Sequence, residues 1–284
     1  MMISVEKYNS LSEAADSVAS GGRYYGGGTL VMRAVNYAEE GYDRLVVAHD
    51  PVLKEIRVDG NRLVIGAGVT MAEIVGSKDA GFLAVAARSI GGPAIRNAAT
   101  VGGNLFAEHP YGDFTTALLA LDATVTMSGG IQQDLEQFLS SRENITGIVQ
   151  SVSCTLPDRG TFRFRKISRV KPKGISVMSI AAWLPQPGGR ISNARIAFGA
   201  MGPASLRAKG AEQALEGSGL DETSADRAGA ALSNDLQPFD DPIASAWYRR
   251  PSLAGSAVPT ARRKQPSMAT MCSFGTRSAT VRIS

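Results

Sequence analysis

The sequence contains few residues that could ligate a metal ion or form disulfide bonds. Its 284 residues include two cysteines, Cys154 and Cys272, and two histidines, His49 and His109. The cysteines are far apart and form no Cys-x-x-Cys pair, so the chain has no ligand set for zinc or an iron–sulfur cluster. We therefore expect a chain that binds no metal itself and works in a reducing compartment, the cytoplasm.

Long apolar runs are missing as well. No stretch approaches the ~18 apolar residues needed to span a bilayer, and residues 1–10 contain Glu6, Lys7 and Asn9 where a signal peptide would be apolar. We expect neither a membrane span nor a secretory leader. A hydrophobic content of 44% over 284 residues is nevertheless enough for a buried core, divided between two domains.

A basic surface for nucleic acid is absent from most of the chain. The formal net charge is +4, but residues 249–284 contain seven of the 30 basic residues and no acidic one. Positions 1–248 therefore hold 23 basic residues against 26 acidic ones. Because no basic stripe with interleaved aromatic residues remains, we do not expect nucleic-acid binding.

Glycine, by contrast, is abundant, with 31 residues, and it forms two informative clusters at residues 26–29 and 100–104. The first, Gly-Gly-Gly-Thr, lies between a predicted strand at 24–25 and a predicted helix over 30–38. Such a turn directs free backbone N–H groups at a ligand, and glycine lets an anion approach them closely. The two clusters predict two loops that converge on the diphosphate of a dinucleotide. Neither has the P-loop pattern, and Gly66-Ala67-Gly68 lacks the Rossmann spacing.

Hydrophobic periodicity and turn residues predict an alternation of short helices and strands. Helices are expected over 12–19, 30–38, 71–77, 114–121, 208–215 and 224–232. Strands are expected over 24–25, 43–48, 55–58, 62–66, 122–127, 162–166, 175–184 and 191–199. The pattern over 63–156 is mixed and has no regular βαβ repeat. Strands followed by helices after Thr161 predict an α+β second domain.

Several residues near the clusters have two interpretations that the sequence leaves open. A lone Gly-Gly-Gly-Thr is more often a plain turn than a ligand loop. Arg96 could steer a phosphate or pin its loop by bonding carbonyls. Asp113 could contact a cofactor or cap the helix that begins at Phe114. His109 could be a general base, although a loop histidine without a partner is usually just solvated. Lys171 and Lys173 are typical of a solvated loop.

Taken in order, the motifs resemble those of a known family. They are the two glycine clusters, the stretch Ile65-Gly66-Ala67-Gly68, the run over 90–105, and Asp113 with the segment 117–123. This series resembles the FAD-binding medium subunit of molybdenum hydroxylases, a group that includes carbon monoxide dehydrogenase, xanthine dehydrogenase and bacterial N-heterocycle dehydrogenases. Residues 164–166 and 241–250 resemble its later signatures. The likeness covers about 8–250, and 90–104 is its most specific part.

The resemblance implies an α+β fold. Residues 1–160 would form a two-lobed FAD-binding domain of the vanillyl-alcohol-oxidase/PCMH type, with lobes at about 1–58 and 59–160. Residues 161–250 would form a smaller α+β domain with a three-stranded antiparallel sheet and helices. Residues 251–284, rich in Ser, Pro, Thr and Arg, depart from the family's apolar C-terminal helix. We interpret them as an atypical basic tail that is disordered, frame-shifted or ordered against a partner.

The resemblance also implies which residues contact FAD. The first loop would hold the pyrophosphate, and the second would lie on its other side, toward the flavin. Asp113 would accept hydrogen bonds from FAD hydroxyls, Lys166 would place a cation near the flavin, and Leu156 would pack on the cofactor. The full set is Tyr25, Gly26, Gly27, Gly28, Thr29, Leu30, Ile95, Ala99, Thr100, Gly102, Gly103, Asn104, Asp113, Leu156 and Lys166.

The function implied is that of an electron-transfer flavoprotein subunit. A large molybdenum-cofactor subunit would oxidise the substrate, and a small iron–sulfur subunit with [2Fe-2S] clusters would relay electrons to this chain's FAD and on to an external acceptor. The assembly would be a dimer of heterotrimers, and no substrate-hydroxylating or other catalytic residue is expected here. The alternatives are a stand-alone flavin oxidoreductase, for which only His109 and Lys166 are candidate acid–base residues, and a non-catalytic nucleotide-binding protein.

Overall fold

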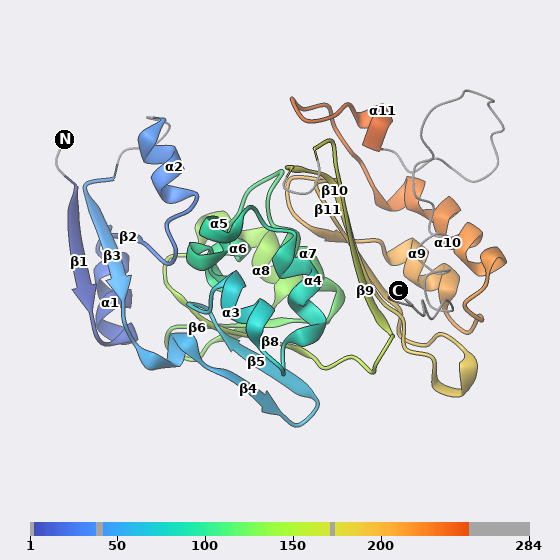
Figure 1. Cartoon of the computed structure of the whole chain (residues 1–284), viewed down its shortest axis with the longest axis horizontal. Coiled ribbons are helices and arrows are strands. Elements are labelled where there is room, and N and C mark those ends of the chain that lie inside the picture. The colour runs from blue at the N-terminus through green and yellow to red at the C-terminus, as the bar shows by residue number, and fades with distance from the viewer. Residues whose placement is uncertain (1–2, 38–41, 171–173, 250–284) are drawn as a thin grey trace, which may run out of the picture.

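The computed structural model describes residues 3–37, 42–170 and 174–249. Their helices and strands form three sheets around two hydrophobic cores (Figure 1). The first core joins the two sheets of the N-terminal half, and the second lies between the third sheet and its helices. None of the helices in these ranges is long and apolar enough to cross a bilayer.

The first sheet is small and parallel, with the strand order β1 (Ser4–Tyr8), β3 (Arg44–Ala48), β2 (Arg23–Tyr24). Helix α1 (Leu11–Ala19) packs on it and buries Leu11 and Ala14. Helix α2 (Val31–Asn36) follows the first glycine cluster and buries none of its residues completely. The predicted strand–turn–helix order at this cluster is therefore confirmed.

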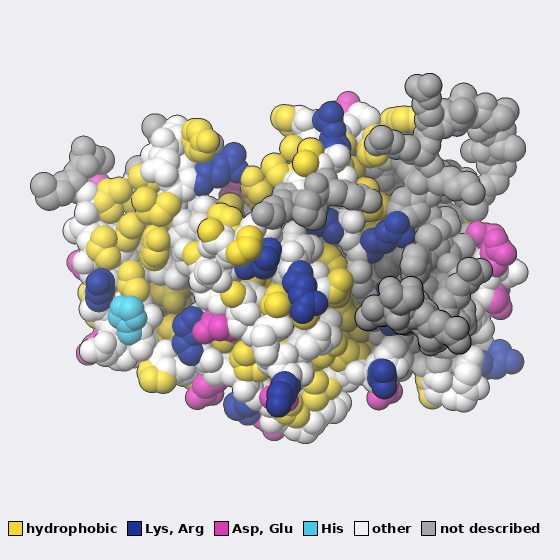
Figure 2. Space-filling model, in the orientation of Figure 1, with side chains coloured by type: hydrophobic (Ala, Val, Ile, Leu, Met, Phe, Trp, Pro, Cys, Tyr) yellow, Lys and Arg dark blue, Asp and Glu magenta, His cyan; other side chains and the backbone are white. Residues whose placement is uncertain are grey.

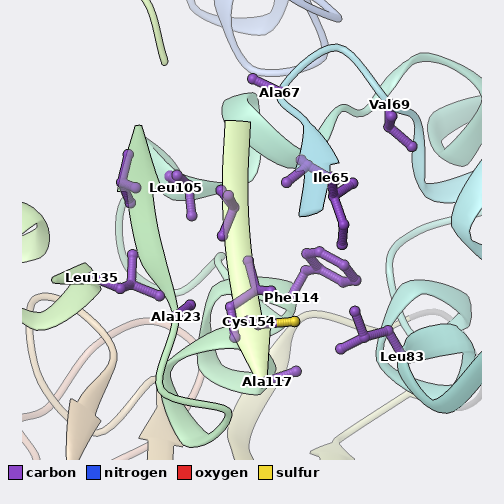
Figure 3. Close-up of a cluster of buried hydrophobic side chains, with 14 of the residues drawn as sticks. Ile65, Ala67, Val69, Leu83, Leu105, Phe114, Ala117, Ala123, Leu135 and Cys154 are labelled. Atoms are coloured by element: carbon purple, nitrogen blue, oxygen red, sulfur yellow. The ribbon is translucent and has the colours of Figure 1, made fainter. Parts of the chain in front are cut away.

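The second sheet is antiparallel, in the order β4 (Ile56–Asp59), β5 (Arg62–Gly66), β8 (Val149–Thr155), β6 (Thr124–Met127), β7 (Gln132–Asp134). Its helices are α3 (Met71–Gly76), α4 (Ala84–Arg88), α5 (Pro93–Ala98), α6 (Val101–Leu105), α7 (Asp113–Ala120) and α8 (Leu135–Ser141). All eight residues of α7 are buried. Figure 3 shows Phe114 of this helix beside Cys154 and Ile65 of the sheet.

Short 3₁₀ helices complete the connections: η1 (Pro51–Lys54), η2 (Gly81–Leu83), η3 (Arg142–Asn144) and η4 (Pro187–Gly189). The turn Asp59-Gly60-Asn61 joins β4 to β5 as a hairpin, as its residue types predict. Thr70 caps α3, since its hydroxyl accepts from the Glu73 amide while Glu73 reaches back to the Thr70 amide. The pair forms a capping box at the start of the helix predicted over 71–77.

The third sheet is antiparallel, in the order β12 (Leu206–Arg207), β11 (Arg195–Gly199), β10 (Ser176–Trp183), β9 (Phe162–Ser168). It therefore has four strands, and the prediction of three was wrong. The fourth strand is only two residues long, too short to produce an alternating pattern. Helices α9 (Lys209–Leu215) and α10 (Glu222–Asp235) confirm the predicted helical pair, and α11 (Ala246–Arg249) follows them.

Strand β10 is buried on both faces. Met178, Ile180 and Ala182 belong to the core shared with α9 and α10. On the opposite face, Ala181 belongs to the first core, and the Ser179 hydroxyl lies 3.4 Å from the Thr116 hydroxyl of α7. The third sheet is thus packed between α7 on one side and α9 and α10 on the other.

Candidate cofactor site

The first glycine cluster forms an open turn between β2 and α2. The Tyr25 amide donates to the Val46 carbonyl at 2.8 Å, which fixes the start of the turn on β3. Within the described ranges, no hydrogen bond engages the backbone N–H groups of residues 26–29. Gly28 has a φ of +69°, and a Cβ there would overlap the Tyr25 ring, so glycine is required. The turn therefore presents several unpaired amides.

Tyr24, which precedes this turn, is also suited to an anionic ligand. A Cβ on Gly26 would lie 3.5 Å from the Tyr24 ring, so the ring and the turn are neighbours. Burial raises the pKa of Tyr24 to about 12. The phenol therefore stays neutral at ordinary pH and does not repel a diphosphate.

The second glycine cluster is not a loop, as the sequence had indicated, but the helix α6 with Thr100 at its N-cap. Its amides are already paired. Val101 N donates to Val69 O at 2.9 Å, Gly102 N to Ala67 O at 2.8 Å, Gly103 N to the Thr100 hydroxyl at 3.1 Å, and Asn104 N to Thr100 O at 3.0 Å. The expectation that both clusters offer free amides was therefore wrong for the second.

The two clusters nevertheless meet in space, as the sequence predicts. A Cβ on Gly27 would overlap the carbonyl oxygen of Ala98, and a Cβ on Gly26 would lie 3.2 Å from the Thr100 hydroxyl. Gly103, at the exposed start of α6, would bring a Cβ to 3.0 Å from the same hydroxyl. Glycine at 26 and 27 thus allows the open turn to lie directly against the end of α5 and the cap of α6.

Helix α6 is held in place by close backbone packing. A Cβ on Gly102 would lie 2.8 Å from the Ala67 Cβ, so glycine lets α6 approach the turn after β5. The Ala99 carbonyl accepts from the Met71 amide at 2.9 Å, and Thr70 pairs with Thr100 as an isolated bridge. These contacts fix α6 to β5 and α3, so it forms a rigid wall facing the open turn.

Arg96 stabilises the loop before α5 through hydrogen bonds to its backbone carbonyls. Its guanidinium donates to the carbonyls of Ile90 at 3.2 Å and Gly91 at 2.7 Å, which settles the two interpretations in favour of loop pinning. Its neighbour Ile95 is 44% exposed on α5, an apolar side chain available to a ligand. Thr29 and Leu30 are half-buried at the entrance to α2.

Asp113 and Lys166 form a buried ion pair beyond α6. Lys166 Nζ lies 2.8 Å from Asp113 Oδ2 and donates to the Ser89 carbonyl at 3.0 Å, and the two side chains are 13% and 8% exposed. Ser176 Oγ donates to Asp113 Oδ1 at 2.6 Å. Asp113 also stands in the first turn of α7, where the helix dipole favours a carboxylate. The pair joins β9 and β10 to the first domain.

Asn104 connects this pair to the second cluster. Its side-chain oxygen accepts from the Thr115 amide at 2.9 Å, and its carbonyl accepts from the Thr115 hydroxyl at 2.8 Å. The end of α6 is thereby tied to the start of α7, on which Asp113 lies. Asn104, Asp113 and Lys166 are therefore brought together with the glycine clusters through a continuous set of contacts.

Leu156 is the predicted site residue that the structure places apart. Its amide donates to Asn61 at the start of β5, whereas Gly66 and the glycine clusters lie at the other end of that strand. A cavity of about 300 Å³ lies next to it, lined mainly by Phe82, Phe162 and Phe164 and by residues 157–160. Leu156 packs against the first core from its partly buried position.

His109 is not a solvated loop residue, and that expectation was wrong. Its Nε2 lies 2.5 Å from Asp241 Oδ2 and its Nδ1 lies 3.1 Å from the Gly202 carbonyl. Burial alone would raise the pKa of Asp241, but hydrogen bonds from His109, the Ala244 amide and Arg249 hold that pKa well below its usual range. Asp241 and Arg249 were not predicted as functional residues, because their contacts with His109 and Val177 join positions that are remote in sequence.

Further residues bear on the predictions. Arg33 of α2 donates to the Tyr111 hydroxyl, which ties the first lobe to the segment before α7.

Lys171, Lys173 and the tail 251–284 lie outside the described residues. In the parts of the chain that are described, no group of three or more His, Cys, Asp or Glu side chains could hold a metal ion.

The geometry can be tested against the shape of a flavin dinucleotide. The open turn, with its unpaired amides, lies against a wall of small residues, and any side chain at Gly27 would push the turn away from that wall. Such a cradle suits a diphosphate. Figure 2 shows a notch in the surface between α2 and the upper ends of β10 and β11, with Lys and Arg side chains beside it. The residues present therefore fit the expected cofactor.

Comparison with protein families gives two matches that cover most of the chain. Residues 2–153 match the family described as the FAD binding domain in molybdopterin dehydrogenase. Residues 163–263 match the family described as the CO dehydrogenase flavoprotein C-terminal domain. The second match extends past residue 250, where the motif-based likeness had ended.

Similar proteins include enzymes with different substrates. The carbon monoxide dehydrogenase medium chain of Hydrogenophaga pseudoflava is 25% identical over 220 residues, which cover 73% of this chain and 76% of that one. The indole-3-acetaldehyde oxidase of Arabidopsis thaliana is 28% identical over 88% of this chain but only 21% of its own length. Among solved structures, the carbon monoxide dehydrogenase of H. pseudoflava matches with a TM-score of 0.81 and 22% identity, over 88% of this chain and 92% of that chain.

Proposed function

The chain belongs to the family of FAD-binding subunits of molybdenum-containing dehydrogenases, and from this membership we propose that it collects electrons and passes them to an external acceptor. Its cofactor is FAD, and it is the flavoprotein subunit of a multi-subunit oxidoreductase. Flavin suits the relay because it supports both one- and two-electron transfer, while the protein supplies position and electrostatics.

The observation that carries this proposal is that a turn with unpaired amides lies against a helix, α6, whose first amides are all paired. We propose that the free amides of residues 26–29 hold the FAD pyrophosphate against the wall made by Ala99, Thr100, Gly102 and Gly103. Tyr25, Leu30 and Ile95 would supply apolar contacts beside it. A cradle of neutral amides binds a diphosphate without a lysine, because each N–H donates to a phosphate oxygen.

The Asp113–Lys166 pair would lie toward the flavin, with Asn104 linking it to the diphosphate end. Lys166 has a third N–H beyond those engaged by Asp113 and Ser89, and that donor is available to the cofactor. The remaining lone pairs of the Asp113 carboxylate could still accept from FAD hydroxyls. Leu156 would contact the cofactor only if FAD extended the length of β5 from the glycine clusters.

We propose further that the partners are a large subunit with the molybdenum cofactor and a small subunit with [2Fe-2S] clusters, assembled as a dimer of heterotrimers in the cytoplasm. The two lobes would then be those of a PCMH-type FAD domain. Substrate oxidation would take place on the large subunit, which agrees with the different substrates named for similar proteins.

Expression of the chain alone and together with its two neighbouring subunits tests the proposal. The chain should carry a yellow chromophore that is released as FAD, and it should copurify with both partners. Dithionite-reduced complex should then pass electrons to an added acceptor only when the flavin is present. A colourless chain would favour a non-catalytic nucleotide-binding protein, and substrate turnover by the isolated chain would favour a stand-alone oxidoreductase.

A further inference from the structure

Asp241 is the centre of a buried charge cluster between the two domains. Its Oδ2 lies 2.5 Å from both His109 Nε2 and Arg249 Nη2, and its Oδ1 accepts from the amides of Ile243 and Ala244 at 2.8 and 2.9 Å. All four contacts favour the ionised carboxylate. The segment that carries Asp241 thus folds around its own side chain while holding a residue of the first domain.

Arg249 completes the cluster with a side chain that is 0% exposed. Nε donates to the Val177 carbonyl at 3.1 Å, and Nη1 donates to the carbonyls of Phe239 at 2.7 Å and Ala244 at 3.0 Å. Every guanidinium nitrogen therefore has an acceptor. A buried cation satisfied in this way specifies position more than it adds stability, because desolvation offsets much of the attraction.

Both ring nitrogens of His109 have a hydrogen-bond partner in this arrangement. Gly202 presents a carbonyl to Nδ1 and Asp241 presents a carboxylate to Nε2, and each of these groups can only accept. Phe239 covers the ring, with the centroids 4.7 Å apart. The imidazole ring therefore joins the segment over 106–112 to the C-terminal segment through a hydrogen bond to the Asp241 carboxylate.

Both ends of this cluster lead to the Asp113–Lys166 pair. His109 lies in the segment that connects α6 to α7, and Asp113 is the first residue of α7. Arg249 holds the carbonyl of Val177, and the adjacent Ser176 donates its hydroxyl to Asp113 at 2.6 Å. The segment that precedes Asp113 and the start of β10, which bonds to the Asp113 side chain, are consequently both held by residues that contact Asp241.

We propose that His109, Asp241 and Arg249 form a latch that positions the Asp113–Lys166 pair against the flavin. The inference rests on the proposed function, since it assigns these three residues a role in setting the flavin's surroundings. They are positioning residues, because none of them needs to touch the cofactor. The latch also explains why a C-terminal segment remote from both glycine clusters carries a fully buried arginine.

The test is the flavin midpoint potential of the full chain purified with FAD. Asp241→Asn removes the charge that His109 and Arg249 share. The matched control is Asp235→Asn, because Asp235 also accepts two backbone amides, from Gly210 and Ala211 at 2.9 Å each, but lies on the α9–α10 side of the third sheet. Lys166→Met gives the reference shift, a lowered potential, since it removes the cation that favours reduced flavin.

In Asp241→Asn we expect the potential to fall in the same direction as in Lys166→Met, and FAD to dissociate at least about tenfold faster, as loss of a charged hydrogen bond allows. Asp235→Asn should lower the melting temperature without moving the potential. An Asp241→Asn chain with lowered melting temperature but wild-type potential and dissociation rate would overturn the latch.

A second variant decides the matter should Asp241→Asn fail to fold. Ser176→Ala removes only the hydroxyl that joins β10 to Asp113, and its potential should shift in the same direction by a smaller amount. An unchanged potential in that variant contradicts the latch. A wild-type chain that binds no FAD would remove the proposed function itself and the latch with it, so the two failures are distinguishable.

Discussion

The two glycine clusters look alike in sequence but differ in what their backbones do. Residues 26–29 form a turn whose amides have no partner in the described structure, whereas the amides of residues 101–104 are all engaged by carbonyls or the Thr100 hydroxyl. In the first cluster glycine leaves room for a ligand and for the opposing backbone. In the second it lets a helix approach β5. The same residue type thus produces a binding surface in one place and close packing in the other.

The largest expected effect comes from forcing the two clusters apart. Gly27→Ala places a Cβ on the Ala98 carbonyl, so the open turn must move, and FAD binding should weaken by on the order of a hundredfold, or about 2.7 kcal/mol. Titration of apo-protein with FAD, followed by flavin fluorescence, measures this. Gly76→Ala is the matched control, since no atom lies within 4 Å of its Cβ. Equal affinity in both variants would contradict the role of the first cluster.

A substitution in the second cluster should reduce stability more than it reduces FAD affinity. Gly102→Ala brings a Cβ to 2.8 Å from that of Ala67, and overpacking of this kind costs about 1–3 kcal/mol of stability. Chemical denaturation should detect this loss, while the FAD affinity of the folded protein should fall by less than about tenfold. A Gly102→Ala chain of normal stability that cannot bind FAD would instead make the second cluster the main diphosphate site.

Two threonine caps allow an effect on FAD binding to be separated from an effect on stability, because removing either cap should lower the free energy of unfolding by the same amount. Thr100→Val and Thr70→Val each remove a hydroxyl that accepts from an N3 amide, so each should lower the free energy of unfolding by about 1 kcal/mol. Only Thr100 lies against Gly26, so only Thr100→Val should also weaken FAD binding. Parallel denaturation and FAD titration compare the pair. If Thr70→Val weakened binding as much, the effect would be one of stability alone.

Acid should loosen the second cluster slightly. Hydrogen bonds from Thr70 and Lys54 outweigh desolvation and lower the pKa of Glu73 below its ordinary value of 4.5. A carboxyl with a lowered folded-state pKa stabilises the protein above pH 4.5, and this contribution is lost as the pH falls through and below that value. Because Glu73 is half exposed, the loss should be only about 0.3 kcal/mol. The melting temperatures of wild type and Glu73→Gln should differ at pH 6 and lie closer together at pH 4. An equal difference at both pH values would contradict this assignment.

Local sequence signals were sufficient for much of the fold. The buried helix α7, the β4–β5 hairpin and the Thr70 cap follow from apolar content, a tight-turn tripeptide and a capping pair, all of which act over a few residues. Helix α5 was missed because Gly91-Gly92-Pro93 was interpreted as a chain break, although proline is favoured at the first position of a helix. Helix α6 was missed because two of its five residues are glycines, which lower helix propensity. Packing against Ala67 and the Thr100 cap stabilises α6 regardless, and neither contact has a periodic signature.

The candidate site likewise has features that the sequence predicts and features that depend on distant contacts. Which glycines matter could be read from their clustering, but which amides stay free depends on carbonyls at Ala67 and Val69, more than thirty residues away. The His109–Asp241 contact spans 132 residues of sequence. No single-sequence pattern encodes such a pairing, so a histidine without a visible partner was taken for a solvated one.

Because β10 is buried on both faces, we expect that the two regions of this chain cannot be expressed separately as folded proteins. A cut between β8 and β9 would separate the two matched families, yet each piece would keep one half of a shared interface. The C-terminal piece would expose the row that contains Ala181 and Ser179, and the N-terminal piece would expose α7. Separate expression of the halves should therefore give aggregates, whereas their coexpression should restore a clipped but intact particle. We therefore expect the two regions that match different families to fold as a single unit.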